Sequence, residues 1–328
     1  MPRRKTGGAG SHGPVAAINL GNHLLDQRRS TGPIGGTVRV SMVSPLALSI
    51  EQDANELRLA FFWRRRLLQV TSGHRVIGTA KAGNNVDDRV TARGLIMIKT
   101  EEHDGIILVT IDRPPVNAVD HQSVLDLMQA FKRVKENERA KGLVLTGSGD
   151  CFCAGVDVRA FREYSPEAKR EMILDITRMT HALLSLSIPV VAGVNGTAMG
   201  GGMVLALCAD ARISLNREQR YWGLPEARAG IPFPAGPMEI IQAELPAPLL
   251  RQLTLLCRTF TPQELSDAGV VDEMCRPKEI VRKSIETCQE MAALPAFGAV
   301  KDQLKAGLRE KVGQWMAAGD DPLLQYIR

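Results

Sequence analysis

The chain has 328 residues, of which 44% are hydrophobic, so it can bury the core of one large domain or of two. It contains no stretch of 18 or more consecutive apolar residues, and we therefore expect no membrane-spanning helix. Residues 1–94 hold 14 Lys and Arg against 6 Asp and Glu, a net charge of +8; the whole chain carries +5, which leaves −3 for residues 95–328. The main body is thus mildly acidic, which argues against a nucleic-acid partner.

Residues 1–94 are basic and rich in glycine, a composition that rarely buries a core. We interpret this stretch as a disordered N-terminal extension, or as translated leader sequence upstream of the true start. The alternatives are a targeting segment and a segment that contacts nucleic acid or a membrane surface. We expect a cytoplasmic protein, and targeting to an organelle by the extension stays open.

The ordered part is expected to begin near Leu95 with short buried strands and amphipathic helices. The turn His103-Asp104-Gly105 between two apolar runs predicts a hairpin, and Asp120 is suited to cap the helix that follows. In chain order, the predicted elements are strands at 95–99 and 106–111, a helix after Asp120, a strand at 142–145, a helix from Pro166 to about Ser187, and a strand at 211–215.

The stretch from Pro189 to Asp210 predicts a buried strand, a break at Asn195-Gly196, and a buried helix that opens with Gly200-Gly201-Gly202. Each glycine in a helix costs about 0.5–1 kcal/mol relative to alanine. Glycines at this point therefore indicate that the backbone must be left bare. Free N–H groups at a helix start suit an anion, or an oxygen that becomes negatively charged during a reaction.

The six cysteines follow no pattern of paired zinc ligands, and several lie in apolar surroundings. We therefore expect no metal site and no disulfide framework, as is usual in a reducing compartment. The cysteines are Cys151, Cys153, Cys208, Cys257, Cys275 and Cys288.

Residues 221–237 are dense in glycine and proline, which predicts an irregular loop with a fixed path. Beyond Met238 the sequence predicts helices to the end of the chain, with helix starts at Thr261-Pro262 and Arg276-Pro277.

Three motifs stand in order: Phe-Cys-Ala-Gly-Val-Asp at 152–157, Ala-Gly-Val-Asn-Gly at 192–196 with Gly200–Gly202, and Leu-Pro-Glu at 224–226 before Gly-Ile-Pro at 230–232. In this order and spacing they resemble the enoyl-CoA hydratase/isomerase family, the crotonase superfamily, over about residues 95–328. The resemblance implies an α/β fold, a crotonase-like spiral of ββα units over 95–245, and a helical C-terminal trimerisation or lid region over 246–328. It also implies an acyl-CoA thioester as substrate, no further cofactor, and a homotrimer or hexamer.

By the same resemblance, the backbone amides of Val156 and Gly201 hold the thioester oxygen, and Glu226 moves protons. The resemblance places the substrate against Ala154, Gly155, Asp157, Gly200, Val204, Trp222 and Arg159. For two of these features the sequence also permits a structural role. Asp157 is suited to cap a helix, and the three glycines could serve only close packing of a helix on a strand.

One position departs from the family pattern. Hydratases of the family usually carry a glutamate two residues after the glycine triplet, where this chain has Val204, which can neither donate nor accept a proton. The second family glutamate is present as Glu226. We expect its site to be partly apolar, which would raise its pKa toward neutrality. A single carboxylate favours an enoyl-CoA isomerase, which shifts a double bond. The alternatives are an enoyl-CoA hydratase and a non-catalytic protein that binds acyl-CoA.

Overall fold

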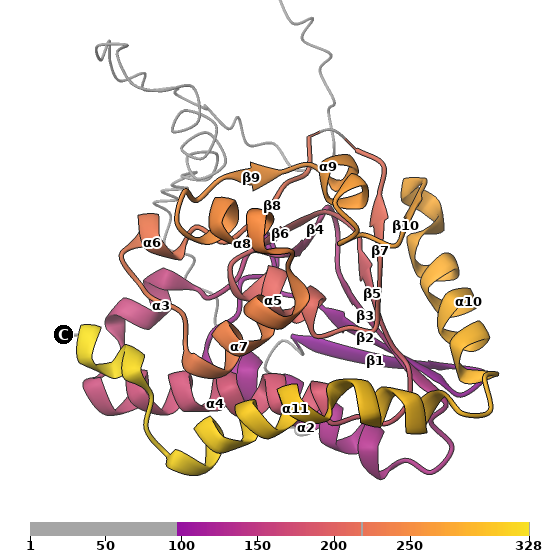
Figure 1. Ribbon diagram of the computed structural model, residues 1–328, viewed down its shortest axis with the longest axis horizontal. Helices are drawn as coiled ribbons and strands as arrows, with labels where there is room; N and C mark the ends of the chain where they lie inside the picture. The colour runs from indigo at the N-terminus through magenta and orange to yellow at the C-terminus, as the bar shows by residue number, and fades with distance from the viewer. Residues whose placement is uncertain (1–96, 218, 328) are drawn as a thin grey trace, which may run out of the picture. The chain divides into compact units, whose positions relative to one another are not determined.

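The computed structural model describes residues 97–217 and 219–327, which belong to one compact unit spanning Asn85–Arg328. The predicted N-terminal extension, residues 1–94, lies outside the described residues. In the described part of the chain, every helix is too short or too polar to cross a membrane. The architecture is mixed α/β, as the sequence predicts (Figure 1).

The larger sheet has six strands in the order β1-β2-β3-β5-β7-β10. β1 and β2 form the predicted antiparallel hairpin, and each later neighbour pairs in parallel. The strands are β1 (Ile98–His103), β2 (Ile106–Ile111), β3 (Gly142–Gly147), β5 (Val190–Val194), β7 (Ala211–Leu215) and β10 (Glu273–Cys275).

The inner strands of this sheet are buried on both faces, because their alternate side chains pack into different cores, whereas the edge strand β1 is mostly exposed. Ile106 and Leu108 belong to the smaller core, which also includes residues of α10 (Ile280–Ala292). Ile107 and Val109 point the other way, into the main core with α2 (His121–Glu136) and α4 (Pro166–Leu184). Figure 1 shows α10 standing against the sheet, while α2, α4 and α11 (Phe297–Ala318) run along its lower side.

A second, four-stranded sheet positions the candidate site. Its order is β4-β6-β8-β9, with β4 (Cys151–Cys153), β6 (Thr197–Met199) and β8 (Trp222–Gly223) parallel, and β9 (Thr259–Phe260) antiparallel to β8. Each parallel strand leads into a helix: α3 (Val158–Glu163), α5 (Gly201–Leu207) and α6 (Glu226–Ala229). Since the carboxyl ends of parallel strands meet at one edge, the three sequence motifs are brought together there.

Several helix starts are confirmed. The Asp120 carboxylate accepts a hydrogen bond from Ser123 N and caps α2, and Ser165 caps α4 in the same way. Thr261 and Glu264 form a reciprocal capping box at the start of α9 (Pro262–Asp267). Arg276 precedes the 3-10 helix η1 (Pro277–Glu279), and its N–H donates to the carboxylate of Glu279, the last residue of η1, at 3.3 Å.

Two predictions about the later chain are wrong. The part beyond Met238 is not wholly helical, because β9 and β10 interrupt α7 (Ala235–Glu244), α8 (Ala247–Thr254), α9, α10, α11 and η2 (Pro322–Tyr326). The 221–237 stretch is not loop throughout, because it contains β8, α6 and the start of α7. These strands have two or three residues, too few to show a period, and their partners are distant in sequence: Trp222 pairs with Phe260, and Cys275 with Leu215.

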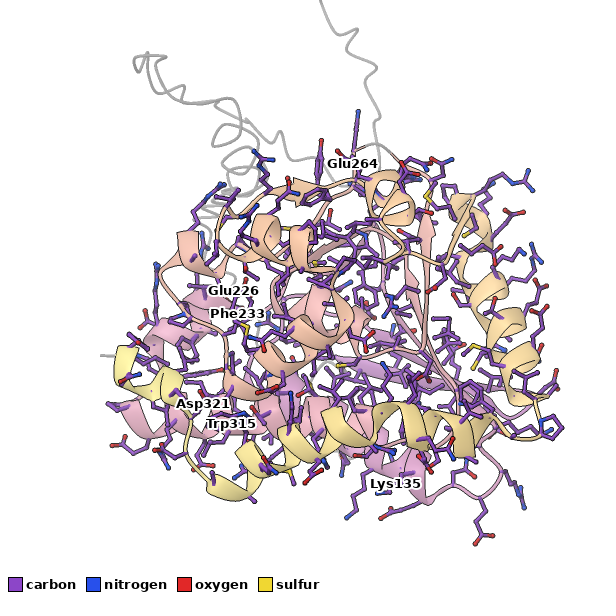
Figure 2. All side chains as sticks on the ribbon, viewed as in Figure 1. Lys135, Glu226, Phe233, Glu264, Trp315 and Asp321 are labelled. Carbon is purple, nitrogen blue, oxygen red and sulfur yellow. The ribbon has the colours of Figure 1, made fainter. Side chains whose placement is uncertain are left out.

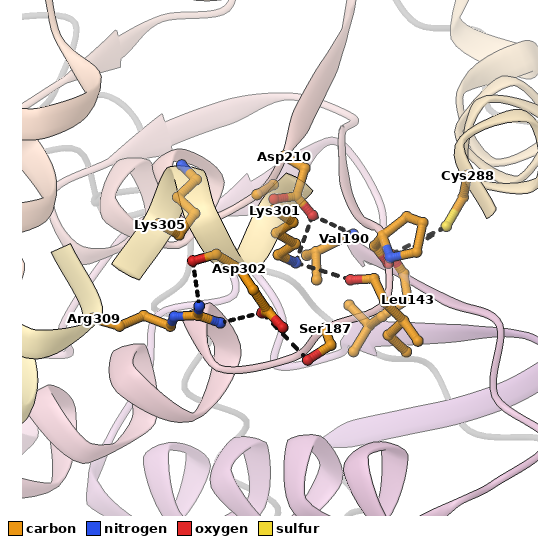
Figure 3. A network of polar contacts seen from close by, with 12 residues as sticks. Leu143, Ser187, Val190, Asp210, Cys288, Lys301, Asp302, Lys305 and Arg309 are labelled. Atoms are coloured by element: carbon orange, nitrogen blue, oxygen red, sulfur yellow. Dashed lines mark hydrogen bonds and ion pairs between the residues drawn. The ribbon is translucent and has the colours of Figure 1, made fainter. Parts of the chain in front are cut away.

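A buried ion pair between Lys301 and Asp210 holds the long helix α11 next to the start of β5 (Figure 3). The Lys301 ammonium lies 2.6 Å from the Asp210 carboxylate and donates to Ile188 O at 2.9 Å. Asp210 also accepts from Val190 N, at the start of β5. One turn further along α11, Lys305 pairs with Glu244, so two buried lysines fasten the C-terminal part to the core.

Replacement of Gly202 by alanine should destabilise the fold, because its Cβ would overlap the carbonyl oxygen of Cys153. We expect the free energy of unfolding to fall by about 1–3 kcal/mol, the usual cost of overpacking. The matched control is Gly307→Ala, on α11, where a Cβ meets no atom within 4 Å. That variant should gain about 0.5–1 kcal/mol. Urea unfolding of both proteins measures the difference, and equal stabilities would contradict the close approach.

Candidate active site

The first candidate oxyanion donor is the amide of Val156, in the turn between β4 and α3. Gly155 adopts a φ of +84°, which L side chains rarely tolerate, and this turns the chain out of β4. The turn is paired with Val119: Val119 N donates to Gly155 O at 2.8 Å, and Asp157 N donates to Val119 O at 2.8 Å. In this parallel bridge the N–H of Val156 points away from Val119, and it has no acceptor among the described residues.

The second candidate donor is the amide of Gly201, the first residue of α5. Gly200 has φ +55° and ψ −126°, and its own N–H donates to Gly223 O at 2.8 Å, which fixes the turn. The first N–H groups of a helix have no partner within the helix, and that of Gly201 finds none elsewhere in the described chain. It is therefore free to bind a ligand oxygen.

The two amides are neighbours. A Cβ built on Gly155 would lie 3.1 Å from Gly201 N, and one built on Gly201 would lie 3.9 Å from Val156 N. Side chains at these positions would occupy the space in front of the amides. The structure thus brings together, from two separate motifs, a pair of bare donors of the kind that stabilises a developing oxyanion.

The carboxyl group of Glu226 lies close to Gly200, the residue before the second amide donor. A Cβ on Gly200 would be 2.9 Å from Glu226 Oε1, so the carboxyl group lies directly against the start of α5. Its other oxygen, Oε2, is buried and has no hydrogen-bond partner in the described chain. Burial raises the pKa of Glu226 from 4.5 to about 7. Figure 2 places Glu226 in the same part of the molecule as Phe233, one of the partly buried apolar residues packed on the core.

The predicted substrate contacts are placed in different ways. Gly155 directly precedes Val156 and Gly200 directly precedes Gly201, so both glycines lie next to the two amides. Ala154 precedes Gly155, and its N–H donates to Val116 O at 3.0 Å. Val204 and Trp222 are buried, with exposed fractions of 2% and 0%. Arg159 is exposed on α3.

Asp157 has a structural role. Its carboxylate accepts from Arg159 N and Ala160 N, both at 3.2 Å, and so caps α3, as its sequence position permits. It also pairs with Arg113, at 2.9 Å. Sequence reasoning missed Arg113, because an arginine before Pro114-Pro115 reads only as the end of a strand. Nothing in the sequence shows that it faces residue 157.

The other reactive side chains are packing residues or have polar partners of their own. Burial raises the pKa of Cys151 to about 11 and that of Cys153 to about 12, so both are neutral packing residues at physiological pH. Within residues 97–217 and 219–327 no cluster of three or more histidine, cysteine or acidic side chains could hold a metal ion. Glu239 accepts from Trp315 Nε1 at 3.4 Å. His121 lies 2.8 Å from Asp175, at the start of α2.

A pair of free amides beside a largely buried carboxyl group is an arrangement suited to stabilising an oxyanion and moving a proton. The family model for enoyl-CoA hydratase/isomerase matches residues 101–327. The chain belongs to the enoyl-CoA hydratase/isomerase family, and its fold is the crotonase fold.

Similar proteins agree with this assignment. A peroxisomal fatty acid beta-oxidation multifunctional protein of Oryza sativa subsp. japonica is 31% identical over 183 residues, which is 55% of this chain and 25% of the rice protein. YngF of Bacillus subtilis is 29% identical over 203 residues, 61% of this chain and 76% of YngF. The chain thus spans only a quarter of the rice protein.

Solved structures share the fold. An enoyl-CoA hydratase from Mycobacterium ulcerans has a TM-score of 0.63 at 22% identity, covering 68% of this chain and 97% of that one. An enoyl-CoA isomerase from Mycobacterium tuberculosis has a TM-score of 0.62 at 24% identity, with the same coverage. At these identities the likeness shows the fold and does not decide between the two reactions.

The raised pKa of Glu226 predicts a pH-dependent loss of stability. Below pH 4.5 the carboxyl group is protonated in both the folded and the unfolded chain, whereas above pH 7 the folded chain must ionise it while buried. The free energy of unfolding of the wild type, relative to Glu226→Gln, should therefore fall by about 3 kcal/mol between pH 4 and pH 8. Chemical unfolding of both proteins across this range measures the difference. A constant difference would show that Glu226 titrates normally.

Proposed function

We propose that this protein is an enoyl-CoA isomerase that converts 3-enoyl-CoA to 2-enoyl-CoA, with Glu226 as its only proton carrier. The observation that carries the proposal is the contact of the Glu226 carboxyl group with Gly200, beside the amides of Val156 and Gly201. Val204 stands where the family's hydratases usually have a second glutamate.

In this mechanism the thioester oxygen lies between the N–H groups of Val156 and Gly201. Glu226 removes a proton from C2, and the electron pair spreads over the chain as a dienolate whose negative charge rests mainly on that oxygen. The same carboxyl group then returns the proton to C4, and the double bond is left between C2 and C3. Each amide donor stabilises the charged intermediate by about 2.7–4 kcal/mol, the amount lost when such a donor is removed.

The pKa of Glu226 suits both halves of this cycle. A carboxyl group of pKa about 7 is a stronger base than an exposed glutamate and remains acidic enough to return the proton. The cause of the raised pKa is burial. The apolar site that raises it also strengthens the hydrogen bonds of the two amides, because the local dielectric constant is low.

Hydration is less well supported. Addition of water needs a group to activate the water as well as a group to protonate C2, and the family's hydratases usually divide this work between two glutamates. Val204 can do neither, and its side chain is buried, with an exposed fraction of 2%.

We also propose that the substrate is an acyl-CoA thioester, that no cofactor besides it is needed, and that the protein forms a homotrimer or hexamer. Exposed apolar side chains in the C-terminal part support the assembly. They include Leu294, Val300 and Leu304, with exposed fractions of 57%, 57% and 77%.

Glu226→Gln should lower kcat for 3-enoyl-CoA isomerisation by about a thousandfold, since general acid–base catalysis contributes 10²- to 10⁴-fold. The assay runs in deuterated water, and mass spectrometry follows deuterium entering the acyl chain at C2 and C4. The matched control is Glu239→Gln, a partly buried carboxyl group on α7 that contacts Trp315, and its rate should be unchanged. Equal rates for wild type and Glu226→Gln would remove Glu226 from the mechanism.

The same assay distinguishes the alternative functions. Hydration of crotonyl-CoA at the isomerisation rate would favour a hydratase. Tight binding of acyl-CoA without deuterium exchange would favour a non-catalytic protein.

The pH dependence of kcat/KM should report the same carboxyl group. Only the ionised form can accept the C2 proton, so kcat/KM should rise with pH, reach half its maximum near pH 7 and then level off. Initial rates from pH 5 to pH 9 test this. A half-maximum near pH 4.5 would show that Glu226 is not the base.

A further inference from the structure

Arg113, at the end of β2, connects the two segments that shape the first oxyanion donor. One Nη atom lies 2.9 Å from the Asp157 carboxylate and donates to Ala118 O at 2.8 Å. The other lies 3.1 Å from the Asp120 carboxylate. The three side chains are half-buried, with exposed fractions of 22%, 21% and 21%, so the pairs are partly shielded from water.

The two carboxylates that Arg113 joins are both helix caps. Asp120 accepts from Ser123 N at the start of α2, and Asp157 accepts from Arg159 N and Ala160 N at the start of α3. One guanidinium therefore fixes the starts of two helices relative to each other. Its planar fork holds two donor groups in a fixed geometry toward two acceptors, whereas a lysine ammonium group is a point charge on a flexible stem.

The amide of Val156 lies just before the start of α3, in the turn that pairs with Val119, just before the start of α2. Val119, next to Asp120, pairs with Gly155 and Asp157 through two hydrogen bonds of 2.8 Å, and Val156 lies between them. We propose that Arg113 is a positioning residue, which holds the Val156 N–H in line with the thioester oxygen by clamping Asp120 to Asp157. This inference rests on the proposed function, because it assigns the amide its role.

Loss of Arg113 has a clear physical consequence. The two carboxylates lie within about 3 Å of one guanidinium, so without it two like charges face each other across the Val119–Val156 bridge. Their repulsion pushes the turn at Gly155–Asp157 away from the Val119 segment. Because a displacement of about 1 Å in a catalytic group can cost 10²-fold in rate, even a small shift of the Val156 amide is measurable.

Three variants test the clamp. Arg113→Gln removes the charge, Arg113→Lys keeps the charge without the fork, and Asp157→Asn breaks one pair but preserves the cap of α3, since asparagine caps as well as aspartate. We expect kcat to fall about 10- to 100-fold in Arg113→Gln, with KM changed less than about threefold, and by smaller factors in the other two. The control is Arg212→Gln, which breaks a buried arginine's pairs with Glu244 and Asp272 in a different part of the fold. It should lose stability but keep its kcat at a temperature where it stays folded.

A spectroscopic measurement separates positioning from general stability. Butyryl-CoA, labelled with carbon-13 at the thioester carbonyl, cannot isomerise, and its carbonyl stretch in the infrared shifts to lower frequency when both amides donate to the oxygen. We expect this shift in wild type and Arg212→Gln, and a smaller shift in Arg113→Gln and Asp157→Asn. Unchanged shift and kcat in the folded Arg113 variants would overturn the clamp and leave the proposed function intact. No shift in the wild type would instead refute the oxyanion role itself.

Discussion

The candidate site depends on an unusually close approach of the backbone between the turn after β4 and the start of α5. A Cβ on Gly155 would lie 2.7 Å from Met199 O, and a Cβ on Gly202 would overlap Cys153 O. Only glycine fits at these two points, and each glycine costs conformational entropy on folding. In return, two peptide N–H groups from segments more than 40 residues apart come to face the same small volume.

The same crowding explains the behaviour of Glu226. Its carboxyl group packs against Gly200, and its Oε2 atom has no hydrogen-bond partner among the described residues. A buried, unpaired carboxylate is costly, so the group holds its proton up to about pH 7. The burial that raises the pKa of Glu226 also lowers the local dielectric constant beside the two amides, which strengthens hydrogen bonds made there.

Much of this arrangement could be predicted from the sequence. The apolar run before Gly200, the hairpin at Asp104-Gly105 and the cap at Asp120 are local signals, and each leads to the element that the structure contains. The resemblance to the family placed Val156, Gly201 and Glu226 at one site, and the parallel order of β4, β6 and β8 explains why they meet.

The rest depends on contacts that no local pattern records. β9 and β10 are too short for a period, and they exist because Phe260 and Cys275 pair with strands 38 and 60 residues earlier in the chain, at Trp222 and Leu215. Arg113 shows no signal, because its partners Asp120 and Asp157 are ordinary helix caps in the sequence. The buried Lys301 and Lys305 likewise read as surface residues of an amphipathic helix until Asp210 and Glu244 are placed opposite them.

A crystal structure of the protein with a bound acyl-CoA would test the central claim most directly. The account predicts a thioester oxygen about 2.7–3.1 Å from both Val156 N and Gly201 N, with C2 and C4 of the acyl chain facing the Glu226 carboxyl group. A thioester oxygen that meets neither amide, or an acyl chain that runs away from Glu226, would contradict it.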